Sequence, residues 1–179
     1  DRFAGKPLVF CGTVGLIPKK INKKFSHIKK ANHNDLIIMV GGRVGKDGIH
    51  GATFSSEELD PNSPVSAVQI GDPITQKKLS DVIIKELRDR DLYTSITDNG
   101  AGGLSSSIGE MGKESGGFIV NLEKIPLKYK GLYPWEIWIS ESQERMTLAV
   151  KPKDAKSVIK IFKQRGVEAT IIGKFTKQK

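Results

Sequence analysis

Two glycine-dense segments constrain the fold of this chain more than any other feature of its sequence. Residues 41–51 and 100–117 together hold twelve of the 19 glycines. No helix or strand tolerates five glycines in the eleven residues 41–51, so this segment is predicted to be a loop with positive-φ positions. It directly follows Leu36–Val40, whose length and branched side chains predict a buried strand. A loop of this kind can point backbone N–H groups at an anion.

The candidates for an anion- or nucleotide-binding loop within this segment are Gly45, Asp47, Gly48 and His50. The segment is not a dinucleotide-binding fingerprint. It is not a Walker A motif either, because Asp47 follows the Gly-Lys pair where that motif needs Ser or Thr. The loop alone therefore does not define a class of ligand.

Apolar periodicity predicts alternating strands and helices along the chain. The clearest helix has Asp72 as its N-cap, Pro73 at its first position and an apolar stripe that includes Leu79, Val82 and Leu87. This order predicts a mixed α/β (α+β) fold, in which crossover helices pack on a sheet. The expected strands are residues 7–16, 36–40, 65–70, 93–97, 118–122, 146–150 and 167–175, and the other expected helices are residues 104–113, a short one from 134, and 153–164.

Length and composition exclude several classes of protein. A chain of 179 residues suits one domain, and it needs no disulfide to hold it. The single cysteine, Cys11, lies in an apolar segment and is interpreted as a buried, inert thiol. No apolar run approaches the ~18 residues of a membrane span. The start at Asp1 lacks Met and a signal peptide, so we interpret it as a cut end and expect a cytoplasmic protein with no membrane contact.

The net charge of +9 leaves two interpretations open. Six lysines lie within residues 19–30, and three more lie in the last fourteen residues. They form either a patch for a phosphate backbone or a solvated connection and tail. The second interpretation is favoured, because Phe25 is the only stacking aromatic near the first cluster and no zinc-finger, basic-zipper or RNA-recognition signature accompanies it. We therefore expect no nucleic-acid partner.

Polar residues at three junctions between elements are the candidates for chemistry. Gln69 precedes the capped helix, Asp98 precedes the second glycine-dense segment, and Glu141-Ser142-Gln143 precedes a strand. Strand carboxyl ends are where α/β sheets place ligands. Asp98 is suited to Mg²⁺, or else it is a helix cap; Gln69 and Gln143 are ligand contacts, or else satisfied amides near the core. No nucleophile–base pair or metal-ligand spacing occurs, so we assign no catalytic residue.

Four motifs in the same order resemble the phosphoribosylformylglycinamidine synthase family. They are GGRVGKDGIHGATFSS at 41–56, VQIGDP at 68–73, DNGAGGLSSS at 98–107 and SESQERM at 140–146. The last string is identical to the family's motif. Sibling families, such as aminoimidazole ribonucleotide synthase, thiamine-phosphate kinase, selenophosphate synthetase and the hydrogenase-maturation dehydratase, share the fold but not the ESQER and GIHGATF strings.

The resemblance implies a fold and a domain organisation. Residues 21–179 are expected to form the C-terminal domain of the aminoimidazole ribonucleotide synthase superfamily, a mixed sheet with helices that is partly ferredoxin-like. Residues 1–20 are expected to be the tail of a preceding ATP-binding domain. The implied partners are that N-terminal domain, the second half of the same parent chain, and a glutaminase subunit or domain.

The resemblance also implies a reaction. ATP phosphorylates the amide oxygen of formylglycinamide ribonucleotide, and ammonia derived from glutamine displaces the phosphate to give the amidine, with Mg²⁺ as cofactor. Carried over by position, Gln69, Glu141, Ser142 and Gln143 are substrate contacts and Asp98 is a Mg²⁺ ligand. The family's catalytic histidine lies outside this chain, which is therefore expected to be inactive alone. The alternatives are a sibling ATP-dependent kinase or ligase of the same fold and, less favoured, a basic nucleic-acid-binding module.

Overall fold

The computed structural model describes residues 12–51 and 69–177. Cys11 and most of the predicted strand 65–70 lie outside these residues. Of the predicted strand 7–16, the described part, residues 12–16, forms no strand, so that prediction is wrong there. Gln69 and Ile70 also lie outside any strand. An apolar run is not sufficient for a strand when no neighbouring strand pairs with it.

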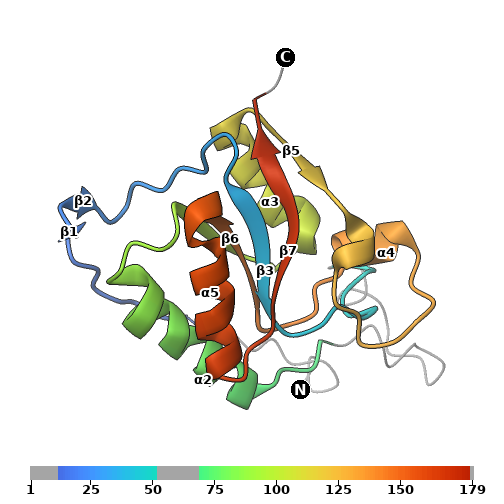
Figure 1. Ribbon diagram of the computed structural model, residues 1–179. Helices are drawn as coiled ribbons and strands as arrows, with labels where there is room; N and C mark the ends of the chain where they lie inside the picture. Colours follow the sequence, from blue (N-terminus) through green and yellow to red (C-terminus); the bar gives the residue numbers. More distant parts are fainter. Residues whose placement is uncertain (1–11, 52–68, 178–179) are drawn as a thin grey trace, which may run out of the picture.

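A five-stranded antiparallel sheet is the centre of the fold (Figure 1). Its order is β4-β6-β3-β7-β5, and each neighbouring pair is antiparallel. The α/β class is confirmed, but the expected mixture of parallel and antiparallel strands is wrong for this sheet. The strands are β3 (Leu36–Gly41), β4 (Ser95–Asp98), β5 (Gly117–Val120), β6 (Arg145–Val150) and β7 (Ala169–Thr176).

Helices cover both faces of this sheet, which explains why β3 is apolar throughout. Ile37 and Met39 pack on the side of α3 (Gly103–Ser115) and α4 (Pro134–Ile139). Ile38 and Val40 pack on the other side, under α2 and α5. Alternate side chains of a strand point to opposite faces, so a strand buried on both faces needs an unbroken apolar run.

The predicted helices are confirmed, with one irregularity. Asp72 caps α2 (Pro73–Val82), because its Oδ1 accepts hydrogen bonds from the backbone N–H groups of Ile74 and Thr75. The same run continues as a π-helix, η2 (Ile83–Arg88), which local periodicity did not predict. The remaining helical elements are α5 (Pro152–Gln164) and the 3₁₀ turn η3 (Leu122–Lys124).

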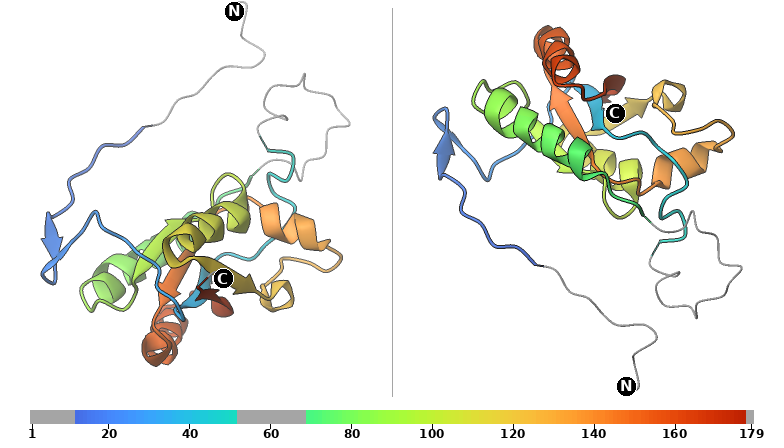
Figure 2. Two further views of the ribbon diagram at one scale, coloured as in Figure 1. Left: turned by 90° about the horizontal axis from the view of Figure 1, so that it is seen from above. Right: turned by 90° about the horizontal axis from the view of Figure 1, so that it is seen from below.

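A small hairpin lies beside the sheet and was not predicted. It consists of β1 (Lys20–Ile21) and β2 (Lys24–Phe25), within the lysine-rich segment. Figure 2 shows that it projects away from the main sheet, near the end of the π-helix. Asn22 Nδ2 donates a hydrogen bond of 2.8 Å to the carbonyl oxygen of Asp89 there. The described part of the lysine cluster is therefore structured rather than only a solvated connection.

The antiparallel order brings the carboxyl ends of β3 and β4 and the amino end of β6 to the same end of the sheet, which we call the strand-end edge. Gly41, the last residue of β3, pairs with Arg145, the first of β6. Asp98, the last residue of β4, pairs with Met146. In the part of the chain that the structure describes, no helix is both long and apolar enough to cross a membrane.

Candidate functional site

The loops at this edge form what we call the strand-end site: residues 41–51, 69–72, 98–103 and 140–145. They include all the residues that the sequence singled out. Glu141-Ser142-Gln143 precedes β6, as the sequence predicted, so this segment reaches the site at the amino end of a strand. The antiparallel pairing of β6 with β3 and β4 still places this segment beside the other loops.

Close backbone approaches hold these loops together. The Gly42 N–H donates to the carbonyl oxygen of Glu144 at 3.0 Å. At the start of α3, Gly103 has a φ of +55°, and a Cβ there would lie 2.0 Å from the carbonyl oxygen of Ser140. A side chain at this position would separate α3 from the loop before β6. Gly103 of the second glycine-dense segment therefore permits the close packing of α3 on this loop.

Ser142 is the buried centre of the hydrogen bonds that join the two main loops. Its Oγ donates to the Asp47 carboxylate and accepts from the Gly45 N–H at 2.9 Å. Its side chain also lies 3.1 Å from the hydroxyl of Ser140. In return, the Glu141 N–H donates to the carbonyl oxygen of Asp47 at 2.8 Å. The glycine-rich loop and the segment before β6 are therefore one connected unit.

Asp47 is an ion-pair partner inside this unit and not a free carboxylate. Lys128 Nζ lies 2.8 Å from its Oδ2. Partial burial raises the pKa of Asp47, but the hydrogen bonds from Lys128 and Ser142 and the charge of Lys128 act more strongly together, so its pKa lies below the usual value of 3.8. The carboxylate is therefore ionised throughout the neutral range.

The depressed pKa of Asp47 predicts a loss of stability in acid. A carboxylate whose pKa is lower in the folded than in the unfolded state stabilises the fold above the unfolded value, and this contribution is lost as the pH falls through the folded pKa. We expect Asp47→Asn to be less stable than the parent sequence at pH 7, with a difference that narrows below about pH 4. Denaturant unfolding between pH 7 and pH 2.5 measures this.

Lys128→Met is the matched control for that experiment, because it removes the other half of the pair. The difference in stability between Lys128→Met and the parent sequence should also become smaller as the pH falls below about 4. A difference between Asp47→Asn and the parent sequence that stays constant from pH 7 to pH 2.5 would contradict the assignment.

Glu141 joins the candidate substrate contacts. Its Oε2 accepts from Gln69 Nε2, and its Oε1 accepts from the Gly102 N–H at 3.1 Å. Its backbone oxygen accepts from Gln143 Nε2 at 2.7 Å. Both glutamine amides are therefore oriented by Glu141. The structure brings the four candidate substrate contacts together, and their role stays a prediction. These are Gln69, Glu141, Ser142 and Gln143.

The other loop candidates are less involved. Gly48 is buried, and a Cβ there would lie 2.5 Å from Glu141 Oε2 and 2.8 Å from Gln69 Nε2. His50 is exposed. Lys46 Nζ lies 3.0 Å from Glu136 Oε1, so this cation is paired. The loop therefore contributes packing and backbone positions more than free charge.

Asp98 is an exposed carboxylate at the end of β4. A Cβ at Gly100 would lie 2.8 Å from its Oδ2, so a glycine there leaves the carboxylate room. The next residue, Asn99, is buried, and its Oδ1 accepts from Ser107 and Thr147. Among the described residues, no hydrogen-bond partner reaches Asn99 Nδ2.

A metal at Asp98 would need ligands from elsewhere. Within residues 12–51 and 69–177, no group of three or more His, Cys, Asp or Glu side chains is placed to hold a metal ion. Mg²⁺ often takes one or two carboxylates and completes its shell with phosphate and water. A single exposed carboxylate therefore fits a shared Mg²⁺–phosphate site and does not fit a self-contained one.

Arg145 is a positioning residue that the sequence did not single out. Its side chain is buried; its Nε donates to the carbonyl oxygen of Ser142 at 2.7 Å and its Nη2 to that of Ser140 at 2.5 Å. Burial lowers its pKa to about 10, opposed by the charge of Asp47, so it is protonated at neutral pH. Arginine is mostly exposed in proteins, so only its place inside the SESQERM string marked it.

The fold and the strand-end site define a domain of the AIR synthase-related class. Residues 32–179 match the family described as "AIR synthase related protein, C-terminal domain", and the chain belongs to this family. The curated relatives are "Phosphoribosylformylglycinamidine synthase subunit PurL": that of Methanopyrus kandleri is 44% identical over 146 residues (79% of this chain, 20% of the relative), and that of Thermoanaerobacter sp. is 42% identical over 179 residues (98% and 24%). The chain thus spans about a fifth to a quarter of the relatives' length.

Solved structures agree with this assignment. A structure titled "T. maritima PurL complexed with FGAR" has a TM-score of 0.73 and 34% identity, over 83% of this chain and 25% of that one. "T. maritima PurL complexed with ATP" has a TM-score of 0.69 and 27% identity, over 88% and 24%. The hydrogenase maturation protein HypE of E. coli, at 21% identity and a TM-score of 0.57 over 82% and 45%, shares the fold. The resemblance carried by the four motifs is confirmed.

Proposed function

We propose that this chain is the substrate-side domain of a phosphoribosylformylglycinamidine synthase. In this role the parent enzyme is an ATP-dependent ligase of purine biosynthesis, working in the cytoplasm. It converts formylglycinamide ribonucleotide to the amidine with ammonia from glutamine. Residues 21–179 form the domain, and residues 1–20 are the tail of the ATP-binding domain before it.

The observation that carries this proposal is the set of contacts around Glu141. They join Gln69 from the VQIGDP segment, Gly102 from the DNGAGG segment and Gln143 from SESQERM. Amide groups fixed by a carboxylate are suited to reading the amide and hydroxyl groups of a polar ribonucleotide. Preorganised groups of this kind lose little freedom on binding.

ATP and Mg²⁺ enter the proposal through Asp98. The exposed carboxylate at the strand-end site is placed to share a Mg²⁺ ion with a substrate or nucleotide phosphate. When bound, the ion would offset charge on the transferring phosphoryl group. Asp98 would hold the ion at the edge next to the substrate amides.

The partners follow from the parent enzyme. Relatives have been solved as PurL with FGAR and as the assembly titled "Structure of PurLQS from Thermotoga maritima". By the same resemblance, this domain would act with the preceding N-terminal domain, with the second half of its parent chain and with a glutaminase that supplies ammonia.

Removing the two glutamine amides tests the proposed substrate contacts. In the parent enzyme, we expect Gln69→Ala and Gln143→Ala each to raise the KM for formylglycinamide ribonucleotide about tenfold or more, with the KM for ATP little changed. A lost hydrogen bond at a polar subsite corresponds to about 1–2 kcal/mol. Steady-state kinetics with ammonia as nitrogen donor measures this. Gln164→Ala, on exposed surface at the end of α5, is the control.

The isolated 179-residue chain should neither hydrolyse ATP nor form product. Reproducible turnover by the purified chain with ammonia, abolished by Asp98→Asn, would overturn this. A sibling kinase or ligase of the same fold is distinguished by its substrate. Its parent enzyme would not convert formylglycinamide ribonucleotide in a reaction that depends on Gln69 and Gln143.

A further inference from the structure

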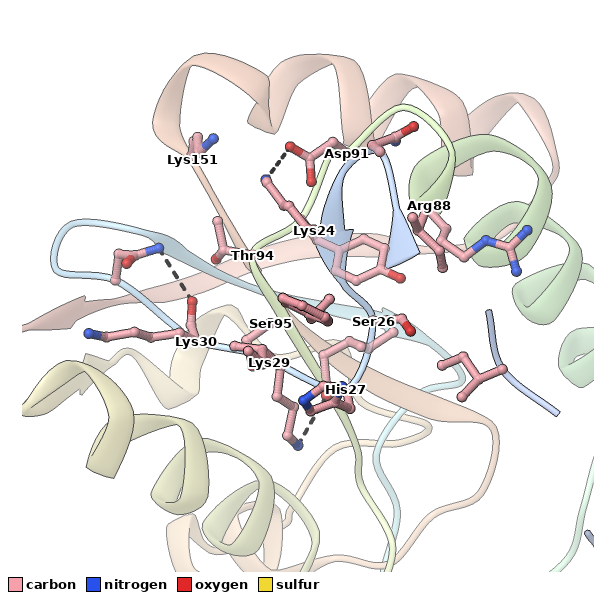
Figure 3. Close-up of a pocket in the computed structure, with 18 residues that line it drawn as sticks. Lys24, Ser26, His27, Lys29, Lys30, Arg88, Asp91, Thr94, Ser95 and Lys151 are labelled. Atoms are coloured by element: carbon pink, nitrogen blue, oxygen red, sulfur yellow. Dashed lines mark hydrogen bonds and ion pairs between the residues drawn. The ribbon is translucent and has the colours of Figure 1, made fainter. Parts of the chain in front are cut away.

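One cavity of this chain, drawn in Figure 3, shares no lining residue with the strand-end site. Its volume is about 460 Å³, within the usual range of small-molecule sites. It lies between the segment that carries the β1–β2 hairpin and the start of β4, and Lys151, just after the carboxyl end of β6, also lines it. The strand β6 begins at the strand-end site, and Lys151 follows its other end. The cavity therefore lies toward the opposite ends of the strands.

The cavity is strongly cationic. Five cationic side chains and one carboxylate line it, and Asp91 supplies the carboxylate. Lys24 pairs with Asp91, and Arg88 pairs with Asp89. Among the described residues, no carboxylate lies within ion-pair distance of the remaining lysines. These are Lys29, Lys30 and Lys151. The uncompensated charge favours an anionic occupant.

Ser95 gives a second, independent indication of a ligand. It is the first residue of β4, it lines the cavity and it is fully buried. In the part of the chain that the structure describes, its Oγ has no hydrogen-bond partner. Buried hydroxyl groups are nearly always paired, so an unpaired one on a cavity wall indicates a missing partner. An anionic oxygen in the cavity would accept its proton.

Apolar side chains in the cavity indicate that the ligand also has an apolar part. Phe25 and Tyr93 both line the cavity, as do Ile17 and Ile28, which are 66% and 64% exposed. Exposed apolar groups beside unpaired lysines suit a ligand with an anionic end and an apolar or planar body. We propose that this cavity binds a phosphorylated small molecule of about mononucleotide size, with its phosphate near Ser95 and Lys30 and its planar part against Phe25 or Tyr93.

Among the described residues, only a few polar contacts join the two walls of the cavity, so a bound ligand is expected to stabilise them. Polar contacts join the hairpin segment to the residues around β4: Asn22 to Asp89, Lys24 to Asp91, and Lys29 Nζ to Thr97 Oγ1 at 2.9 Å. Exposed contacts of this kind stabilise little by themselves. A ligand that bridges the two walls should therefore raise the free energy of unfolding, because it binds the folded chain and not the unfolded one.

Binding of simple probes to the full 179-residue chain tests the proposal. We expect adenosine monophosphate to bind and to raise the unfolding midpoint, adenosine to bind at least tenfold more weakly, and inorganic phosphate to bind weakly but competitively. Lys30→Glu combined with Lys151→Glu should weaken adenosine monophosphate at least tenfold. Lys156→Glu combined with Lys160→Glu makes the same charge change on exposed α5 positions and should have less than a twofold effect. Titration calorimetry measures both pairs.

Ser95→Ala separates a ligand contact from a structural role. Because no described residue hydrogen-bonds to this hydroxyl, its removal should leave the unfolding midpoint unchanged or raise it, while adenosine monophosphate binds about threefold to tenfold more weakly. Equal affinities for adenosine and its monophosphate, or equal losses in the two charge-reversed pairs, would overturn the proposal. Since the cavity shares no residue with the strand-end site, either result leaves the proposed ligase function untouched.

Discussion

Gly41→Ala is expected to destabilise the chain by about 3 kcal/mol, which lowers the thermal midpoint by roughly 6–12 °C. Gly41 ends β3 with a φ of +102°, where an L-residue is strained. A Cβ would also lie 2.0 Å from the carbonyl oxygen of Glu144, so the pair between Gly41 of β3 and Arg145 of β6 would have to open. A backbone atom cannot rotate out of the way as a side chain can.

Gly109→Ala is the matched control in the same chain. Gly109 lies within α3, has ordinary φ and has no atom within 4 Å of its ideal Cβ. Alanine is the better helix former there, so this variant should be as stable as the parent sequence or about 0.5–1 kcal/mol more stable. Thermal unfolding by circular dichroism compares the two. Equal midpoints for Gly41→Ala and Gly109→Ala would show that the edge loops are not held as described.

Local signals predicted the elements that depend on neighbours in sequence. The Asp72-Pro73 pair marked the start of α2, and the run Leu36–Val40 marked a strand covered on both faces. In each case the cause lies within a few residues, so it is visible in the sequence.

Features that depend on distant pairing were missed or wrong. The direction of β6 relative to β3 is fixed by contacts across more than a hundred residues, and no local pattern encodes it. No local pattern encodes the hydrogen bonds of Glu141 either, because its partners Gln69 and Gly102 lie in two other loops. Residue types suggested the candidate residues, whose role as a site stays a prediction, while their hydrogen bonds and the buried Arg145 could be described only from the fold.

The wrong strand over residues 12–16 has a related cause. Val14 and Leu16 are both 103% exposed, so their apolar character is not used within the part of the chain that the structure describes. A strand needs a partner edge, and no described strand offers one to these residues. Apolar content therefore predicted a burial of these side chains that residues 12–51 and 69–177 do not provide.

Asp98→Asn is expected to lower kcat/KM of the parent enzyme by at least about 100-fold while leaving its stability nearly unchanged. Within residues 12–51 and 69–177, β4 is held through its backbone pairing with β6, and its exposed Asp98 carboxylate takes no part in that pairing. Its loss would remove the charged ligand that we propose for Mg²⁺, and a metal that offsets phosphoryl charge contributes several kcal/mol to transition-state stabilisation. Rates should recover in part at high Mg²⁺ concentration, because a weaker site can still be filled.

Asp154→Asn is the control for that result, because it makes the same chemical change in the first turn of α5, which follows the other end of β6. It should leave both kcat/KM and the Mg²⁺ dependence within about twofold of the parent enzyme. Initial rates across a Mg²⁺ series distinguish the two variants. If Asp98→Asn keeps full activity and an unchanged Mg²⁺ dependence, the metal site must be built without this residue. The exposed position of Asp98 would then reflect only the space that Gly100 provides.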